Sequence, residues 1–208
     1  MHKNKESVLW QDFADRCKLS HEQVEQFKRY YQLIVEYNKR FNLTAITDLQ
    51  EVLLYHFEDS IKLDNFIDLS SCSMLSDVGT GAGLPGIPLK ILNPELPVML
   101  VEVSEKKVDF LRLVIEQLGL SDIEVCSLDW RTFLRQTNYP VDVVCARASL
   151  RPDELTRMFK PSSSYKNARL VYWASAEWEI DEKEKLFFDR EESYTVGQKN
   201  RRYIFFKN

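Results

Sequence analysis

The stretch from Met74 to Pro88 (MLSDVGTGAGLPGIP) constrains the fold of this chain more than any other. A short apolar run ends at Val78, three glycines follow at alternate positions, and a helix-like segment begins at Leu84. Glycine permits the backbone angles of a sharp turn and lets a ligand approach the main chain closely. The amides at the start of the next helix favour polar or anionic ligand groups. A glycine-rich turn can also be only a turn, so the surrounding sequence decides what it binds.

The length and composition are those of one ordinary domain with room for a small helical addition. The chain has 208 residues, of which 44% are hydrophobic and 29% charged, and its net charge is −4. This charge argues against a surface covered by nucleic acid. No apolar run approaches the roughly 20 residues that cross a bilayer, and MHKNKESVLW lacks the apolar core of a signal peptide. We therefore expect a cytoplasmic protein with no membrane partner.

The cysteines are scattered and form no metal-binding pattern. They contain no CxxC pair and no histidine at a suitable spacing: Cys17, Cys72, Cys126 and Cys145. We expect reduced thiols, no metal site and a monomer.

Residues 1–65 are predicted to form an N-terminal helical cap, and residues 66–208 the main domain. Ser20 and Gln23 fit a capping box, and Thr47 with Gln50 suggests a second helix start. Apolar side chains then recur three or four residues apart, on one stripe, at Val24, Phe27, Tyr31, Ile34, Tyr37 and Phe41.

From residue 74 onward, strand-like and helix-like segments alternate. The expected strands are 74–78, 97–102, 122–126, 141–146, 168–173, 193–196 and 203–206. The expected helices are 84–92, 104–118 with Gly119 as its end, 129–135, 152–159 and 180–188. This alternation predicts an α/β fold whose seven-stranded sheet is mostly parallel, with one antiparallel strand and helices on both faces.

Two cofactor classes use a glycine loop after the first strand of such a sheet. Dinucleotide-binding enzymes usually have the motif G-x-G-x-x-G, but here Leu84 stands at the position of the third glycine. The actual motif is D-x-G-x-G-x-G, formed by Asp77, Gly79, Gly81 and Gly83. Glu102 ends the second strand, where a carboxylate can accept hydrogen bonds from both hydroxyls of a ribose, or can simply face water. A chain this short has little room for a dehydrogenase substrate domain, so the pattern favours a Rossmann-like class I methyltransferase that uses S-adenosylmethionine (AdoMet).

Five segments make the resemblance specific: FNLTAITDLQEVLLYHFEDSI, DVGTGAGLPGIPL, VSEKKVDFLR, VDVVCARA and RRYIFFK. In this order, from about Tyr30 to Lys207, the chain resembles the RsmG family, also called glucose-inhibited division protein B. Members of that family methylate guanine N7 in small-subunit ribosomal RNA. The resemblance implies the class I fold, AdoMet as cofactor and small-subunit ribosomal RNA as partner.

The resemblance also implies roles for individual residues. The cofactor would be held by Asp77, Gly79, Gly81, Gly83, Leu84, Glu102, Trp130, Arg131 and Arg147, with Trp130 and Arg131 on the adenine. The catalytic residues would be Asn42, His56 and Arg147, with Asp59 beside them. The RNA would be contacted by Lys106, Lys107, Arg151 and Arg201. Structural alternatives remain open at this stage: Asn42 can end a helix, His56 can be a buried hydrogen-bonded side chain, and Arg147 can form a surface salt bridge.

Three departures from the family pattern lie on the substrate side. Trp173-Ala174-Ser175 stands where the family usually has a Lys-Gly pair, Lys160–Ser164 replaces a glycine-rich turn, and Trp130-Arg131 replaces a small-plus-acidic pair. Two further hypotheses therefore stay open beside the ribosomal RNA methyltransferase. One is an RNA- or ribosome-binding protein with impaired catalysis, and the other is a methyltransferase for another RNA or a small molecule.

Overall fold

The centre of the molecule is one seven-stranded sheet with the strand order β3-β2-β1-β4-β5-β7-β6. The computed structural model describes residues 2–147 and 150–208. The parallel strands are β1 (Leu75–Val78), β2 (Val98–Val101), β3 (Ile123–Cys126), β4 (Val143–Arg147) and β5 (Arg169–Ser175). β7 (Lys199–Phe206) runs antiparallel to both of its neighbours, β5 and β6 (Phe188–Val196). The predicted mostly parallel seven-stranded sheet with one antiparallel strand is confirmed.

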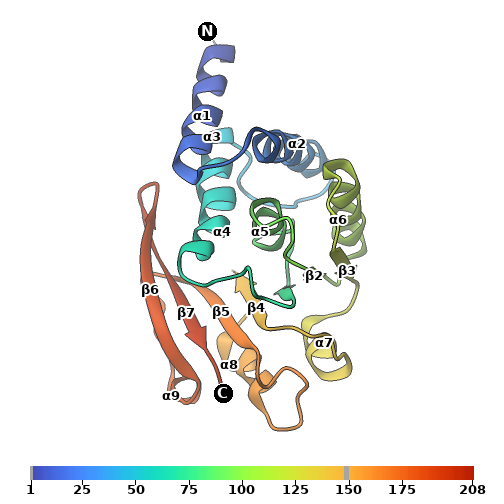
Figure 1. Cartoon of the computed structure of the whole chain (residues 1–208), viewed down its shortest axis with the longest axis vertical. Helices are drawn as coiled ribbons and strands as arrows, with labels where there is room; N and C mark the ends of the chain where they lie inside the picture. Colours follow the sequence, from blue (N-terminus) through green and yellow to red (C-terminus); the bar gives the residue numbers. More distant parts are fainter. Residues whose placement is uncertain (1, 148–149) are drawn as a thin grey trace.

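Helices cover both faces of the sheet, and each face has its own apolar core. One core contains Phe13, Phe27, Phe57 and Phe110 from helices, packed with Leu100 from β2. Its helices are α1 (His2–Cys17), α2 (His21–Asn38), α3 (Leu49–Val52), α4 (Asp59–Ile61), α5 (Gly86–Leu92) and α6 (Glu105–Leu118), with the π-helical turn η1 (Leu53–Glu58) and the 3-10 turn η2 (Lys62–Asn65). Figure 1 shows these helices grouped in the upper part of the molecule. The N-terminal helices and the sheet therefore share one core, while the predicted boundary at residue 65 stays a prediction.

The second core lies under α7 (Trp130–Gln136), α8 (Pro152–Leu155) and the 3-10 turn η3 (Thr156–Phe159). Phe133 and Phe159 pack there against Val78 and Val144. β1 and β2 are buried along their whole length because both faces of the sheet are covered. β2 is accordingly an unbroken apolar run, whereas β1 carries the buried polar residues Ser76 and Asp77.

Capping residues define the helix ends. The Ser20–Gln23 capping box is present, and Gly119 ends α6 with a φ of 61°. The second cap is Asp48, whose side chain accepts from Glu51 N, so the predicted Thr47 start was one residue early. The buried side of α2 holds Phe27, Tyr30, Leu33 and Ile34, so the buried stripe is rotated from the predicted one.

The predicted helix over 180–188 was wrong for most of its length. Only α9 (Glu182–Lys185) is helical, and Phe188 already begins β6. β6 is nine residues long and pairs with β7 from Phe188 opposite Phe206 to Val196 opposite Lys199. Its charged residues lie on an edge strand that is partly exposed, and charge alone does not distinguish such a strand from an exposed helix.

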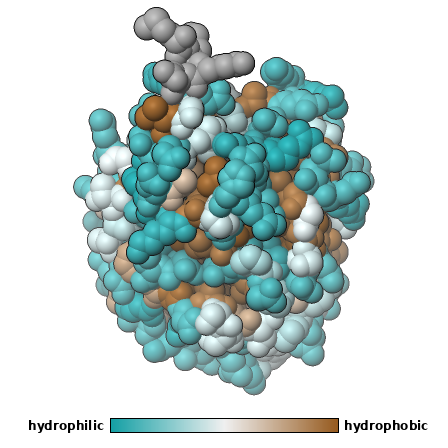
Figure 2. All heavy atoms as spheres, turned by 45° about the horizontal axis from the view of Figure 1, so that its top comes forward, coloured by the Kyte–Doolittle hydropathy of each residue, from teal (hydrophilic) through white to brown (hydrophobic). Residues whose placement is uncertain are grey.

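The described residues contain no helix that is long and apolar enough to cross a membrane. Figure 2 shows hydrophilic side chains over most of one face, with hydrophobic residues in the gaps between them.

Candidate active site

The glycine loop lies at the switch point of the sheet. β1 and β4 are neighbours, yet the chain continues from β1 to β2 on one side and from β4 to β5 on the other. Ligands of such sheets bind beyond the carboxyl ends of the strands at this point. The loop leaves β1 with Gly79 N donating to Val101 O at 2.9 Å, which ties it to the end of β2.

The three loop glycines have positive φ angles, and two of them lack a side chain for different reasons. Their φ angles are 70°, 61° and 95° at Gly79, Gly81 and Gly83. A Cβ on Gly83 would lie 2.4 Å from Ile87 Cδ1 and 2.9 Å from the Tyr30 hydroxyl, so packing excludes a side chain there. A Cβ on Gly81 would meet nothing nearer than Gly79 O at 4.0 Å, so it would project into open space. Gly83 therefore serves packing, whereas Gly81 keeps the main chain accessible.

The buried Asp77 side chain fixes the glycine loop by hydrogen bonds. Its Oδ2 accepts hydrogen bonds from Thr80 Oγ1 at 2.6 Å and from Gly86 N at 2.8 Å. The side chain is fully buried, and this burial raises the pKa of Asp77 from 3.8 to about 6. Its Oδ1 has no hydrogen-bond partner among the described residues. Asp77 thus fixes the loop through one oxygen and leaves the other as a buried acceptor.

Glu102 stands beside the loop with its carboxylate fixed by two amides. Gly81 N donates to Oε2 and Ser104 N to Oε1, each at 3.0 Å. Each carboxylate oxygen has a second lone pair for another donor. This geometry is compatible with a diol such as a ribose.

Arg147, the last residue of β4, reaches into the helical cap. Its two terminal nitrogens donate to Ser60 Oγ at 3.0 Å and to the carbonyl oxygens of Tyr55 and His56, and one lies 3.2 Å from Asp59 Oδ2. The accepting carbonyls belong to η1, a π-helical turn of the kind that often occurs at functional sites. Arg147 therefore links the end of β4 to the cap instead of forming a surface salt bridge. Ala148, the last residue of the VDVVCARA motif, lies outside the described residues.

Asp59 is the centre of a buried polar network. Besides Arg147, its Oδ1 accepts from the Tyr194 hydroxyl at 2.8 Å, and its main-chain oxygen accepts from Tyr203 at 2.9 Å and Trp173 Nε1 at 3.3 Å. Tyr194 and Tyr203 stack with ring centroids 4.3 Å apart. The network joins the cap to β4, β5, β6 and β7.

His56 is buried in the neutral form. Burial, and then the nearby Arg147 charge, lower the pKa of His56 from 6.5 to about 4. Its Nε2 lies 2.7 Å from Thr44 Oγ1, which ties the loop after α2 to the cap. Asn42 lies exposed in that loop, and no described contact joins it to His56 or Arg147. The structure brings His56 and Arg147 together and leaves Asn42 apart, so the three catalytic roles stay predictions.

Four residues predicted to contact RNA lie along the carboxyl edge of the sheet. Lys106 and Lys107 are in the first turn of α6, just beyond β2, and Arg201 lies opposite Ser175, the last residue of β5. Arg151 follows β4 and is 79% exposed, with Asp153 3.2 Å away. Their common edge is compatible with the predicted role, which stays a prediction.

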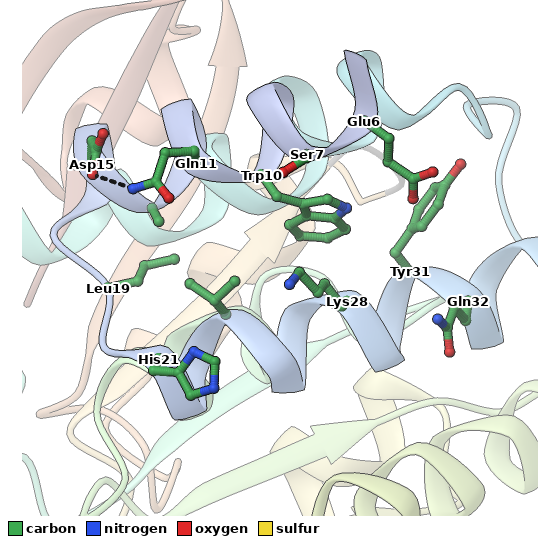
Figure 3. A pocket seen from close by; sticks show the side chains of 12 residues that line it. Glu6, Ser7, Trp10, Gln11, Asp15, Leu19, His21, Lys28, Tyr31 and Gln32 are labelled. Atoms are coloured by element: carbon green, nitrogen blue, oxygen red, sulfur yellow. Dashed lines mark hydrogen bonds between the residues drawn. The ribbon is translucent and has the colours of Figure 1, made fainter. Parts of the chain in front are cut away.

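A cavity elsewhere in the molecule is unrelated to this site. It has a volume of about 660 Å³ and lies between α1 and α2, where Trp10 and Tyr31 point toward each other (Figure 3). None of the predicted site residues lines it.

Comparison with known proteins decides the family. A family model described as rRNA small subunit methyltransferase G matches residues 23–204. The chain belongs to the rRNA small subunit methyltransferase G family. The resemblance predicted from the five sequence segments is confirmed.

Relatives named ribosomal RNA small subunit methyltransferase G support the assignment to this family. The protein of Lactococcus lactis subsp. cremoris is 40% identical over 166 residues, covering 78% of this chain and 69% of the relative. That of Geobacillus thermodenitrificans is 42% identical over 170 residues, covering 80% and 71%. For a Bacillus cereus relative, 42% identical over 145 residues, the shares are 69% and 61%.

Solved structures support the fold of this rRNA small subunit methyltransferase G family member. A SAM-dependent methyltransferase from Aquifex aeolicus aligns with a TM-score of 0.58 at 19% identity, covering 83% of this chain and 98% of that one. Magnesium protoporphyrin IX methyltransferase from Synechocystis PCC 6803, with bound SAM, aligns with a TM-score of 0.56 at 16% identity, covering 86% and 97%. The predicted class I methyltransferase fold is confirmed.

Sequence reasoning missed several contributors to the site of this family member. Tyr55 and Ser60 bind Arg147, and Tyr194, Tyr203 and Trp173 bind Asp59. The partners lie between 87 and 144 residues apart along the chain, so no local spacing indicates these contacts. The only signal was the resemblance, which included RRYIFFK among its segments.

Proposed function

We propose that this chain transfers the methyl group of AdoMet to N7 of a guanine in small-subunit ribosomal RNA. The observation that carries the proposal is the family match over residues 23–204. The geometry at the carboxyl edge of the sheet supports it, because the glycine loop and Glu102 together fit a nucleoside cofactor. We further infer that the protein works as a monomer in the cytoplasm, where small ribosomal subunits are found.

The residues of the loop fit AdoMet. Gly81 leaves open space against the main chain, and Glu102 offers a fixed carboxylate to ribose hydroxyls. Asp77 has a free buried oxygen beneath the same loop. Gly79, Gly81 and Leu84 would hold the methionine and ribose side of the cofactor.

The adenine would lie near Trp130 and Arg131 at the start of α7. The Arg131 guanidinium lies 4.5 Å from the centre of the Trp130 ring, and Arg131 also pairs with Glu154. Arg131 N donates to Asp129 Oδ1, so the turn that would face the adenine has a defined shape.

The reaction needs positioning more than proton transfer. Bound AdoMet would supply an electrophilic methyl group on its sulfonium. Guanine N7 carries a lone pair and no proton, so no general base is required, and neutral His56 is consistent with that. The chain's own contribution is to orient the two reactants and exclude water. Cys145 is not a suitable nucleophile, because burial holds the pKa of its thiol well above the usual range.

Asn42, His56 and Asp59 of the cap are proposed to close over the cofactor and substrate pocket, which Arg147 would line. Support comes from the anchoring of Arg147 to η1 and Asp59, which fixes the cap against the end of β4. Arg147 is 15% exposed at its side chain, so its role would be to shape the pocket wall rather than to reach far into solvent.

A second candidate is an RNA-binding member of the family with impaired catalysis. Trp173 occupies the place of the usual Lys-Gly pair, and it is buried, donating to Asp59 O. The substrate side of the site has therefore lost a group that the family usually has, while the basic cluster between Arg147 and Arg169 could still contact RNA phosphates.

Methyl transfer separates the candidates. Purified protein, labelled AdoMet and unmodified small subunits should yield label at one guanine N7, located by cleavage at the modified base. Naked RNA and small metabolites serve as parallel acceptors. AdoMet binding with no transfer to any acceptor would exclude the enzyme and favour the second candidate.

A further inference from the structure

A basic groove lies between α7, η3 and the loop after η3. It has a volume of about 440 Å³. The residues that give it its character are Trp130, Arg131, Arg135, Glu154, Arg157 and Lys160. Figure 1 shows α7 and the loop after α8 at the end of the molecule opposite α1.

The groove carries positive charge that the protein itself does not neutralise. Arg131 pairs with Glu154, whereas Arg135, Arg157 and Lys160 have no carboxylate within 4.0 Å among the described residues. All three side chains are exposed. Arg135 Nε does donate to the main-chain oxygen of Arg131, which is uncharged. Three cations that form no ion pair with the described residues are a strong local contrast in a chain whose net charge is −4. Such a site attracts a polyanion.

Two departures from the family pattern meet in this groove. Trp130-Arg131, the pair proposed to contact the adenine, forms one end, and Lys160 with Ser162 and Ser163 lines the other side. These segments are about 30 residues apart in the sequence, yet they share one surface. The groove therefore begins at the carboxyl edge of the sheet and continues beyond it along α7.

The chemistry of the groove suits a phosphate backbone better than a base. The Arg131 guanidinium lies over one face of the Trp130 ring, so that face is not open to a base of the RNA. Exposed cations and the serine hydroxyls remain, and these are the groups that contact phosphate oxygens.

We propose that this groove binds the phosphate backbone of the RNA substrate, away from the methylated guanine. The inference rests on the proposed function for the identity of the RNA. It adds a second contact surface to the one predicted at Lys106, Lys107, Arg151 and Arg201. The cations of the groove would supply the attraction for phosphate that the buried, uncharged Trp173 cannot supply.

The test is the salt dependence of binding to unmodified small subunits. The variant Arg135→Gln with Arg157→Gln removes two groove cations. Its control, Lys5→Gln with Arg112→Gln, removes two exposed cations from α1 and α6, which belong to the other face of the sheet. Each phosphate contact contributes about 0.7 to 0.9 to the slope of log K against log salt concentration. Two lost contacts should make the negative slope shallower by roughly 1.4 to 1.8 in the groove variant, and by much less in the control. AdoMet affinity and melting temperature should match the parent in both.

An equal slope for groove variant and control would overturn the inference. So would tight binding of free ATP in the groove without competition by RNA, since that assigns the site to a nucleotide. The readout needs no methyl transfer, so an inactive parent protein that still shows the slope change would refute the proposed function and leave the groove assignment standing.

Discussion

Gly81 and Gly119 have the same φ angle, so alanine variants at the two positions allow a direct comparison. The comparison separates the free-energy cost of a side chain in the left-handed conformation from its effect on cofactor binding. Gly81 and Gly119 both have a φ of 61°, and a Cβ on either would meet no atom closer than 4.0 Å. Gly81 lies in the loop beside Glu102, whereas Gly119 only ends α6. Alanine at either position must adopt a left-handed conformation, which costs about 1–2 kcal/mol.

The two alanine variants should therefore be equally destabilised. For a domain of this size, 1–2 kcal/mol corresponds to a melting temperature about 2–8 °C lower. Binding should differ, because the Cβ of Gly81→Ala fills the open space beside the loop in which the cofactor would approach the main chain. We expect Gly81→Ala to bind AdoMet at least tenfold more weakly, a loss of about 1.4 kcal/mol, and Gly119→Ala to bind it like the parent.

Calorimetric titration of AdoMet and thermal unfolding of both variants measure these quantities. The reasoning would be refuted if Gly81→Ala bound AdoMet within about twofold of Gly119→Ala at equal stability. Affinity loss in both variants would show that global stability, and not the loop surface, controls binding.

The buried network and the titrating groups allow further predictions. Asp59→Asn leaves Arg147 without its counter-charge and should lower the free energy of urea unfolding by about 3–5 kcal/mol. Tyr194→Phe removes one hydrogen bond and should lower it by about 1–3 kcal/mol. Equal costs would contradict the central place of the ion pair. The pKa of His56 is lowered to about 4, so its stabilisation is complete above pH 6.5 and is lost as pH falls through 4, which amounts to about 3 kcal/mol. The pKa of Asp77 is raised to about 6, so its stabilisation is complete below pH 3.8 and is lost as pH rises through 6, again by about 3 kcal/mol. Between pH 4 and 6.5 the two effects oppose each other. Compared with the parent, acidification should therefore stabilise His56→Gln and destabilise Asp77→Asn. Parallel curves of unfolding free energy against pH for all three proteins would contradict these pKa shifts.

Local sequence patterns were sufficient to predict the parallel part of the sheet and the glycine loop. The glycine loop, the capping box at Ser20 and the end of α6 at Gly119 depend on nearby residues, so spacing and residue type predict them. The alternation of strands and helices then leaves few topologies, because parallel crossovers are right-handed. Glu102 was found in the same way, since its place at a strand end follows from the apolar run before it.

The contacts of the cap depend on tertiary structure and could not be predicted. Arg147 binds the carbonyls of a π-helical turn, and no sequence feature of Leu53–Glu58 distinguishes that turn from an α-helix. Asp59 is reached by side chains from the last two strands, whose register is set by pairing across the sheet. The helix predicted over 180–188 is present only at Glu182–Lys185 for a related reason, because the charged residues from Phe188 onward form a strand through their pairing with β7.

The position of β7 has a consequence for the order in which the chain folds during synthesis. β7 is made after β6, yet it lies between β5 and β6, and its Tyr203 donates a hydrogen bond to the main-chain oxygen of Asp59, which lies 144 residues earlier in the chain. During synthesis the N-terminal part of a chain leaves the ribosome first. Here the cap helices can form early, but their polar network stays incomplete until residue 203 has emerged and β7 has entered the sheet. A nascent chain stalled before β7 should therefore expose an open cap with Asp59 and Arg147 still accessible to water.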